Sequence, residues 1–115
     1  MRYHGSCHCG RIAFDVEGDL DKAIECNCSH CSRKGYLLWF VPRGQLTLAT
    51  PEQDMATYTF NKHVIQHRFC PTCGCAPFGL GQAPDGQAMA AINVRCLEGV
   101  ALDGLERVAV DGRSY

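Results

Sequence analysis

Nine cysteines in 115 residues constrain this chain more than any other feature of its sequence. Disulfides within one chain use an even number of cysteines, so nine cannot all pair with one another. Seven of them fall into three groups with short spacings: Cys7-x-Cys9, Cys26-x-Cys28-x-x-Cys31 and Cys70-x-x-Cys73. In a reducing compartment such patterns indicate metal binding more often than disulfides. We therefore expect a cytoplasmic protein whose thiols hold metal ions.

Two of the groups have the form of zinc knuckles. Two cysteines in one tight turn direct both sulfurs toward a Zn²⁺ ion, and a glycine behind them supplies the positive φ that the turn needs. Gly10 follows the first pair and Gly74 follows the last. Because a structural zinc site is closed by four ligands, we predict one formed by Cys7, Cys9, Cys70 and Cys73. Redox disulfides and an iron–sulfur cluster are the alternatives for these thiols.

The remaining group, Cys26, Cys28 and Cys31, offers three thiolates from one short segment. Three protein ligands and an open fourth position are the coordination of a catalytic zinc, where water or a substrate completes the site. The spacing also permits a purely structural site that His30, Cys75 or Cys96 closes. We predict two zinc ions per chain, one structural and one catalytic, with the three cysteines at the catalytic one.

Hydrophobic periodicity predicts strands over most of the chain. Ile12, Phe14 and Val16 alternate with small or acidic residues, which is typical of a half-buried strand. Three hairpins are expected: 36–41 with 46–48, 55–60 with 64–69, and 76–80 with 88–94. Helical signals are confined to one or two turns near 30–35 and to 102–105. We expect a mostly β, single domain over residues 1–115, with antiparallel strands and cysteines in the loops.

Charge and hydropathy disfavour two classes of partner. Eleven basic and twelve acidic residues give a net charge of -1, and Arg33-Lys34 is the longest basic run. A nucleic-acid-binding surface usually shows as a basic stripe, so we expect no nucleic-acid partner. The longest apolar stretch, residues 36–41, is far shorter than the ~20 residues that span a bilayer, and residues 1–10 resemble no targeting peptide. We expect no membrane partner.

Two leftover cysteines and two aromatic residues have ordinary structural interpretations. Cys75 and Cys96 are expected to pack as small apolar side chains, although each also offers a spare thiol. Trp39 and Phe40 lie in an apolar run and are expected in the core; stacking on a bound ligand is their alternative role.

Four polar residues have interpretations that the sequence leaves open. His63 and His67 share one strand face, where they either line a pocket or make ordinary hydrogen bonds. Arg33 and Lys34 follow the three-cysteine group directly, so they either hold a carboxylate of a substrate or are simply solvated.

Three ordered motifs resemble those of the glutathione-dependent formaldehyde-activating enzyme family, which includes centromere protein V. The similarity covers nearly the whole chain, from about Tyr3 to about Arg113. The stretch 57–61, with His63 and His67, is most similar to the centromere protein V branch. The motifs that carry the resemblance are Gly5-Ser6-Cys7-His8-Cys9-Gly10, Cys26-Asn27-Cys28-Ser29-x-Cys31 and Arg68-Phe69-Cys70-x-x-Cys73-Gly74.

The resemblance implies an Mss4-like fold with two zinc sites. In the family, the residues that match Cys7, Cys9, Cys70 and Cys73 hold a structural zinc, and those that match Cys26, Cys28 and Cys31 hold a catalytic one. The activity it implies is that of a carbon–sulfur lyase that combines glutathione with formaldehyde. The partners expected are therefore a small thiol and an aldehyde.

The sequence leaves an alternative function open, and it also gives a reason to expect a dimer. A non-catalytic zinc module for a protein partner would use the second metal only to hold the loop that carries Cys26, Cys28 and Cys31. A small sheet with exposed edges also gives a physical reason to expect a homodimer.

Overall fold

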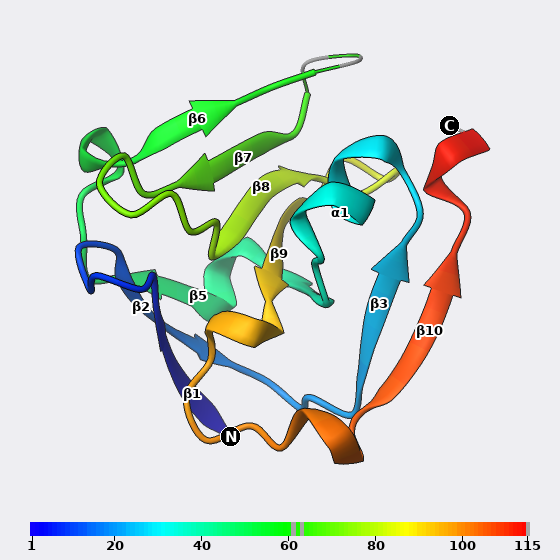
Figure 1. Ribbon diagram of the computed structural model, residues 1–115, viewed down its shortest axis with the longest axis horizontal. Coiled ribbons are helices and arrows are strands. Elements are labelled where there is room, and N and C mark those ends of the chain that lie inside the picture. The colour runs from blue at the N-terminus through cyan, green and yellow to red at the C-terminus, as the bar shows by residue number, and fades with distance from the viewer. Residues whose placement is uncertain (61, 63, 115) are drawn as a thin grey trace.

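The computed structural model describes residues 1–60, 62 and 64–114 (Figure 1). Within them the chain forms two sheets, one short α-helix and several single 3-10 turns. In chain order the elements are β1 (Arg2–Ser6), β2 (Ala13–Glu17), β3 (Lys22–Cys26), α1 (Ser29–Lys34), β4 (Leu38–Pro42), η1 (Arg43–Gln45), β5 (Leu46–Leu48), η2 (Glu52–Asp54), β6 (Ala56–Tyr58), β7 (Gln66–Phe69), β8 (Phe78–Gln82), β9 (Ala88–Asn93), η3 (Val94–Cys96), η4 (Leu102–Gly104), β10 (Glu106–Val110) and η5 (Gly112–Ser114). The mostly β architecture expected from the sequence is confirmed.

The smaller sheet has the order β1-β2-β5, with both pairings antiparallel. The alternation expected around β2 is confirmed, because Ile12, Phe14 and Val16 are fully buried. The Phe14 ring packs edge-on against Phe78 of the larger sheet, with centroids 5.5 Å apart. Gly5 lies under the same ring, and a Cβ there would overlap it. This contact fixes one sheet against the other.

The larger sheet has the order β10-β3-β4-β9-β8-β7-β6. Two of the expected hairpins are confirmed, since β6 pairs with β7 and β8 pairs with β9, both antiparallel. One pairing differs from an all-antiparallel sheet: β10 runs parallel to β3, from Glu106 opposite Lys22 to Val110 opposite Cys26. As Figure 1 shows, these two strands lie side by side; β3 leads into the loop before α1, and β10 leads into the C-terminal turn.

The third expected hairpin, 36–41 with 46–48, is wrong. β4 pairs with β9 in the larger sheet, whereas β5 pairs with β2 in the smaller one. The η1 turn between them carries the chain from one sheet to the other. Proline and glycine signals mark a turn, but they do not determine which strands pair across it.

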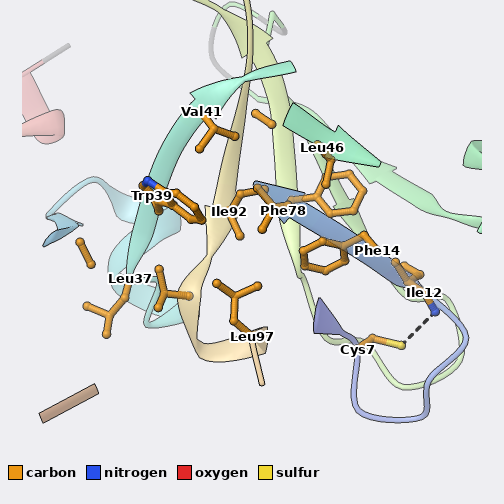
Figure 2. Close-up of a cluster of buried hydrophobic side chains, with 14 of the residues drawn as sticks. Cys7, Ile12, Phe14, Leu37, Trp39, Val41, Leu46, Phe78, Ile92 and Leu97 are labelled. Atoms are coloured by element: carbon orange, nitrogen blue, oxygen red, sulfur yellow. Dashed lines mark hydrogen bonds between the residues drawn. The ribbon is translucent and has the colours of Figure 1, made fainter. Parts of the chain in front are cut away.

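The main core lies between the sheets, and Figure 2 shows its central side chains, including Phe14, Trp39, Phe78 and Ile92. The expectation that Trp39 is buried is confirmed. The same expectation for Phe40 is wrong: 47% of its surface is exposed. Strand alternation turns Phe40 to the face of β4 opposite Trp39, and nothing covers it there among the described residues.

A second, smaller cluster of buried side chains surrounds the group of three cysteines. Cys31, Tyr36, Leu38 and Ala76 are its buried members, and Cys26, Cys28 and Phe69 pack against it. The chain thus places the three-cysteine group on a small apolar base of its own. Of the helices in the described part of the chain, none is long and apolar enough to cross a membrane.

Candidate functional site

The structure brings four cysteines from distant loops together as one group, the four-cysteine cluster: Cys7, Cys9, Cys70 and Cys73. Their Sγ atoms all lie within 4.8 Å of one another. The Sγ atom of Cys9 is 3.7 Å from that of Cys7 and 3.6 Å from that of Cys70. Four sulfurs around one zinc at its usual bond length form a tetrahedron with edges of about 3.8 Å. The cluster therefore has the dimensions and the donor atoms of a zinc site.

Two knuckles of similar backbone form the four-cysteine cluster. In one, Cys7 donates its N–H to the Ile12 carbonyl and Gly10 donates to the Cys7 carbonyl. In the other, Cys70 donates to the Cys75 carbonyl and Gly74 donates to the Cys70 carbonyl. The two glycines have φ of 84° and 82°, so the positive φ expected behind each pair is confirmed.

Backbone N–H groups in these knuckles point at sulfur. Ile12 donates to Cys7 Sγ at 3.3 Å, the bond drawn in Figure 2, and Cys73 donates to Cys70 Sγ at 3.4 Å. A hydrogen bond from the N–H of Cys75 lowers the pKa of Cys73 to about 5, and the N–H of Cys73 lowers the pKa of Cys70. The second knuckle therefore favours the thiolate forms of Cys70 and Cys73. The N–H of Arg11 lowers the pKa of Cys9, but burial and the neighbouring thiols outweigh it and raise that pKa to about 11.

The three-cysteine cluster consists of Cys26, Cys28 and Cys31, whose Sγ atoms also lie within 4.8 Å of one another. Cys26 ends β3, and Cys31 lies in the first turn of α1. Cys28 is the N-cap of that helix, and its Sγ accepts a 3.2 Å hydrogen bond from the N–H of Cys31. The expectation that loops carry all the ligand cysteines is thus wrong for Cys26 and Cys31.

No fourth candidate ligand joins the three-cysteine cluster within the described part of the chain. His30, Cys75 and Cys96, which the spacing left open, are all outside the group. Three sulfurs from one strand end and one helix turn therefore form an incomplete tetrahedron. This is the donor set of a metal site that keeps one position for a further ligand.

The thiols of the three-cysteine cluster differ in their ionisation. Burial raises the pKa of Cys31. Burial also acts to raise the pKa of Cys28, but the N–H of Cys31 and neighbouring thiols outweigh it, so the pKa falls below its usual value. Without a cation, three thiolates this close would repel one another. The donor set fits a soft divalent cation such as zinc, which would let all three ionise.

The C-terminal segment 110–113 packs on the loop that carries this cluster. Asn27 donates its backbone N–H to Val110 O at 3.1 Å and its side-chain amide to Asp111 Oδ1 at 2.9 Å, and its Oδ1 accepts from the N–H of Arg113 at 2.9 Å. Gly112 lies directly on the cluster, since a Cβ at this position would overlap Cys26 Sγ. No local sequence pattern predicted either contact.

A pocket of 820 Å³ lies beside α1, and we call it the aromatic pocket. It shares Tyr36, Phe69 and Ala76 with the apolar base of the three-cysteine cluster. Two cations from α1 line it, Arg33 and Lys34. The rest of its lining consists of Ser29, His30, Tyr58, Phe60 and His67.

The rings of this pocket contact one another closely. His30 and His67 have centroids 4.3 Å apart, Phe60 stacks on His67 at 5.3 Å, and Tyr58 stacks on His30 at 5.5 Å. Of the two open interpretations for His67, the structure favours pocket lining. Burial lowers the pKa of His67 to about 4 and also lowers that of His30. His63, the other histidine considered, lies outside the described residues.

The two leftover cysteines belong to neither cluster, although the backbone of Cys75 forms part of the second knuckle. Cys75 packs against the main core, as expected, and Cys96 is half-buried. Both line a smaller cavity of 300 Å³ that also contacts Lys34 and Tyr36. Burial raises the pKa of Cys96 to about 11, which keeps it as an unreactive thiol at neutral pH.

Comparison with known proteins places this chain in a family. The chain is similar to a crystal structure of a Rhodobacter sphaeroides protein from a structural genomics programme, with a TM-score of 0.77 and 28% sequence identity over 94% of this chain and 100% of that one. The family model described as glutathione-dependent formaldehyde-activating enzyme matches residues 2–108, which include all seven cysteines of the two clusters. The chain therefore belongs to the glutathione-dependent formaldehyde-activating enzyme family.

Proposed function

We propose that this protein is a zinc-dependent enzyme of the carbon–sulfur lyase type that combines glutathione or a related small thiol with formaldehyde or another aldehyde. The observation that carries the proposal is the incomplete donor set of the three-cysteine cluster. One of its ligands, Cys31, lies on the same short helix as the two pocket cations Arg33 and Lys34. Membership of the family supports the reaction class. In this proposal Cys26, Cys28 and Cys31 hold the catalytic zinc, and the four-cysteine cluster holds a structural one.

The proposed reaction needs no redox partner. The thiol sulfur attacks the aldehyde carbon and forms the carbon–sulfur bond, the carbonyl π electrons move to oxygen, and the proton that the thiol releases ends on that oxygen. A zinc ion held by Cys26, Cys28 and Cys31 would supply a cation that favours the thiolate form of the substrate.

Two cations of α1, Lys34 and Arg33, are the candidates to bind and orient the thiol substrate. Lys34 pairs with no carboxylate among the described residues, and its Nζ lies 5.8 Å from the centre of the Phe69 ring, beside the pocket. A free ammonium group at this place suits a carboxylate of glutathione. Arg33 is less available, because its guanidinium donates to the Ser29 carbonyl at 2.9 Å.

The test is an exchange measurement by NMR with ¹³C-formaldehyde and glutathione. Thiols and formaldehyde combine spontaneously, so the protein must raise the rate of exchange between free aldehyde and S-(hydroxymethyl)glutathione above the rate in buffer. We expect Cys28→Ser to lower the protein-dependent part of the exchange rate about a hundredfold or more, because one of three zinc ligands is lost. Cys96→Ser is the matched control and should keep the rate.

Metal exchange separates this proposal from a non-catalytic zinc module. We expect two zinc ions per chain, of which the one in the three-cysteine cluster exchanges faster when glutathione is added. Two ions that exchange equally slowly, together with no increase in the adduct rate, would overturn the enzymatic proposal and favour a binding module.

A further inference from the structure

The aromatic pocket is far larger than formaldehyde, the smallest aldehyde, requires. Its volume of 820 Å³ lies in the upper part of the range for sites that enclose whole small molecules, roughly 300–1,000 Å³. A one-carbon aldehyde would leave the ring-lined part of the pocket filled only by water. The pocket therefore has room for a bulky group besides the thiol.

The ring-lined wall is suited to a planar apolar group. Tyr58 and Phe60 stack on each other at 5.8 Å with their planes 24° apart, so they form one continuous aromatic surface. Half of the Tyr58 surface, 50%, is exposed to solvent. Glutathione is a polar peptide and carries no ring that would cover this surface. An aromatic group would cover it and gain stacking contacts with the two rings.

The other side of the pocket is cationic. Arg33 and Lys34 are its charged residues, and no acidic side chain is among the described residues that line it. Both cations follow Cys31 on α1, so they lie next to the three-cysteine cluster. The rings of Tyr58 and Phe60 line the pocket from the β6–β7 hairpin. A ligand that matches both sides carries a carboxylate near its thiol end and an aromatic ring at the other.

We propose that the aromatic pocket selects the adduct of a carboxylate-bearing thiol with an aromatic aldehyde, and that formaldehyde is the poorer aldehyde for this protein. This inference rests on the proposed function and names its substrate class. The thiol sulfur bonds to the benzylic carbonyl carbon, and the thiol proton ends on the new hydroxyl group. Lys34 holds a carboxylate of the thiol, and Tyr58 and Phe60 stack on the aldehyde's ring.

Binding of inert adduct mimics tests the proposal without any turnover. S-benzylglutathione and S-methylglutathione share the peptide and differ only in the group that the pocket would select. Calorimetric titration of the zinc-loaded protein should give a dissociation constant about tenfold lower, or lower still, for the benzyl compound. Equal affinities for the two compounds would overturn the proposal.

Three variants locate the selectivity. Tyr58→Ala and Phe60→Ala should bring the two affinities within about threefold of each other, since the stacking surface is lost. Phe40→Ala removes an exposed ring outside the pocket and is the matched control, which should keep the wild-type ratio. Lys34→Met should weaken both compounds by the same factor. A benzyl preference that survives both ring variants would overturn the proposal.

Failure of this inference and failure of the proposed function give different results. Faster exchange of formaldehyde with glutathione, without a benzyl preference, would overturn the aromatic selectivity alone. A benzyl preference that depends on Tyr58 and Phe60, without catalysed adduct formation from formaldehyde or benzaldehyde, would overturn the enzymatic function and keep the binding site.

Discussion

At Gly112, the addition of a single methyl group should disturb the three-cysteine cluster. Its Cα faces the three-cysteine cluster so closely that a Cβ would overlap Cys26 Sγ and crowd Cys28 Cβ at 3.4 Å. We predict that Gly112→Ala displaces the C-terminal segment or Cys26 and lowers zinc affinity at this cluster by about 10- to 100-fold, as changes around metal ligands commonly do. Competition with a chromophoric chelator, which resolves two zinc ions of different affinity, measures the effect.

The control for Gly112→Ala is Gly44→Ala. Gly44 has nothing within 4 Å of an added Cβ, and no positive φ requires glycine there. The control should bind both zinc ions as the wild type does. If Gly112→Ala did the same, the backbone at residue 112 would not restrict the cluster.

His67 should make the stability of the fold depend on pH. Burial lowers its folded-state pKa to about 4, whereas the unfolded chain titrates near the usual 6.5. Between these values the unfolded state binds more protons, so the stabilisation is present above pH 6.5 and is lost as the pH falls toward 4. Allowing for solvent screening, we expect the free energy of unfolding to fall by about 1 kcal/mol between pH 7.5 and 5.5 on account of His67.

Urea unfolding of the wild type and of His67→Gln at the two pH values isolates this contribution. Both proteins carry the same cysteine clusters, so the effect of protonating thiols cancels in the difference. Equal pH dependence in the two proteins would mean that His67 is protonated as easily in the folded state as in the unfolded one.

At the scale of elements, Asn27 joins the β3–α1 loop to the segment after β10. Its side chain bonds Asp111 and the backbone of Arg113, and both of those bonds are lost in Asn27→Ala. We expect this change to cost about 1–3 kcal/mol and to speed amide hydrogen exchange at residues 110–113. Arg113→Ala is the control, because Arg113 takes part through its backbone N–H only. Unchanged exchange in Asn27→Ala would show that β10 alone holds the segment.

The elements that the sequence predicted are those whose signals are local. The alternation at Ile12, Phe14 and Val16 defined β2. The Gly-, Pro- and Asp-rich loop 82–87 marked the turn of one hairpin, and the short segment 61–63 between two β-prone runs marked that of another. β10 was missed because it is an edge strand with four of its five side chains exposed, so no buried face appears in its pattern. The parallel pairing with β3 and the transfer of the chain between sheets at η1 depend on contacts far apart in sequence, which periodicity does not contain.

The same distinction applies to the candidate site. Spacing divided the seven cysteines into three groups, and the four-ligand count of a structural zinc site joined the first and last as the structure does. Gly112 and the aromatic pocket were not predicted as parts of the site, since they reach it through the pairing of β10 and through the β6–β7 hairpin. The alternation of Tyr58 and Phe60 was a signal that could have placed both rings on one face.

At the scale of the whole molecule, the four-cysteine cluster links the two sheets. Cys7 and Cys9 lie in the β1–β2 loop of the smaller sheet, and Cys70 and Cys73 lie in the β7–β8 loop of the larger one. Structural zinc contributes about 10–16 kcal/mol in small domains, which is comparable with the whole stability of a domain, about 5–15 kcal/mol. We therefore predict that Cys70→Ser unfolds the protein, as loss of NMR chemical-shift dispersion would show, whereas Cys28→Ser stays folded.

Burial offers a competing reason for the effect of Cys70→Ser, because Cys70 is fully buried and the change puts a smaller, more polar hydroxyl in place of a sulfur that packs in the core. Cys9→Ser separates the two reasons, since Cys9 is exposed and the change keeps its backbone N–H while it removes the sulfur that joins the cluster. If zinc joins the sheets, Cys9→Ser should lose the fold as Cys70→Ser does, and a strong chelator should unfold the wild type. A folded Cys9→Ser protein beside an unfolded Cys70→Ser protein would assign the stability to core packing, with the metal as a minor contributor.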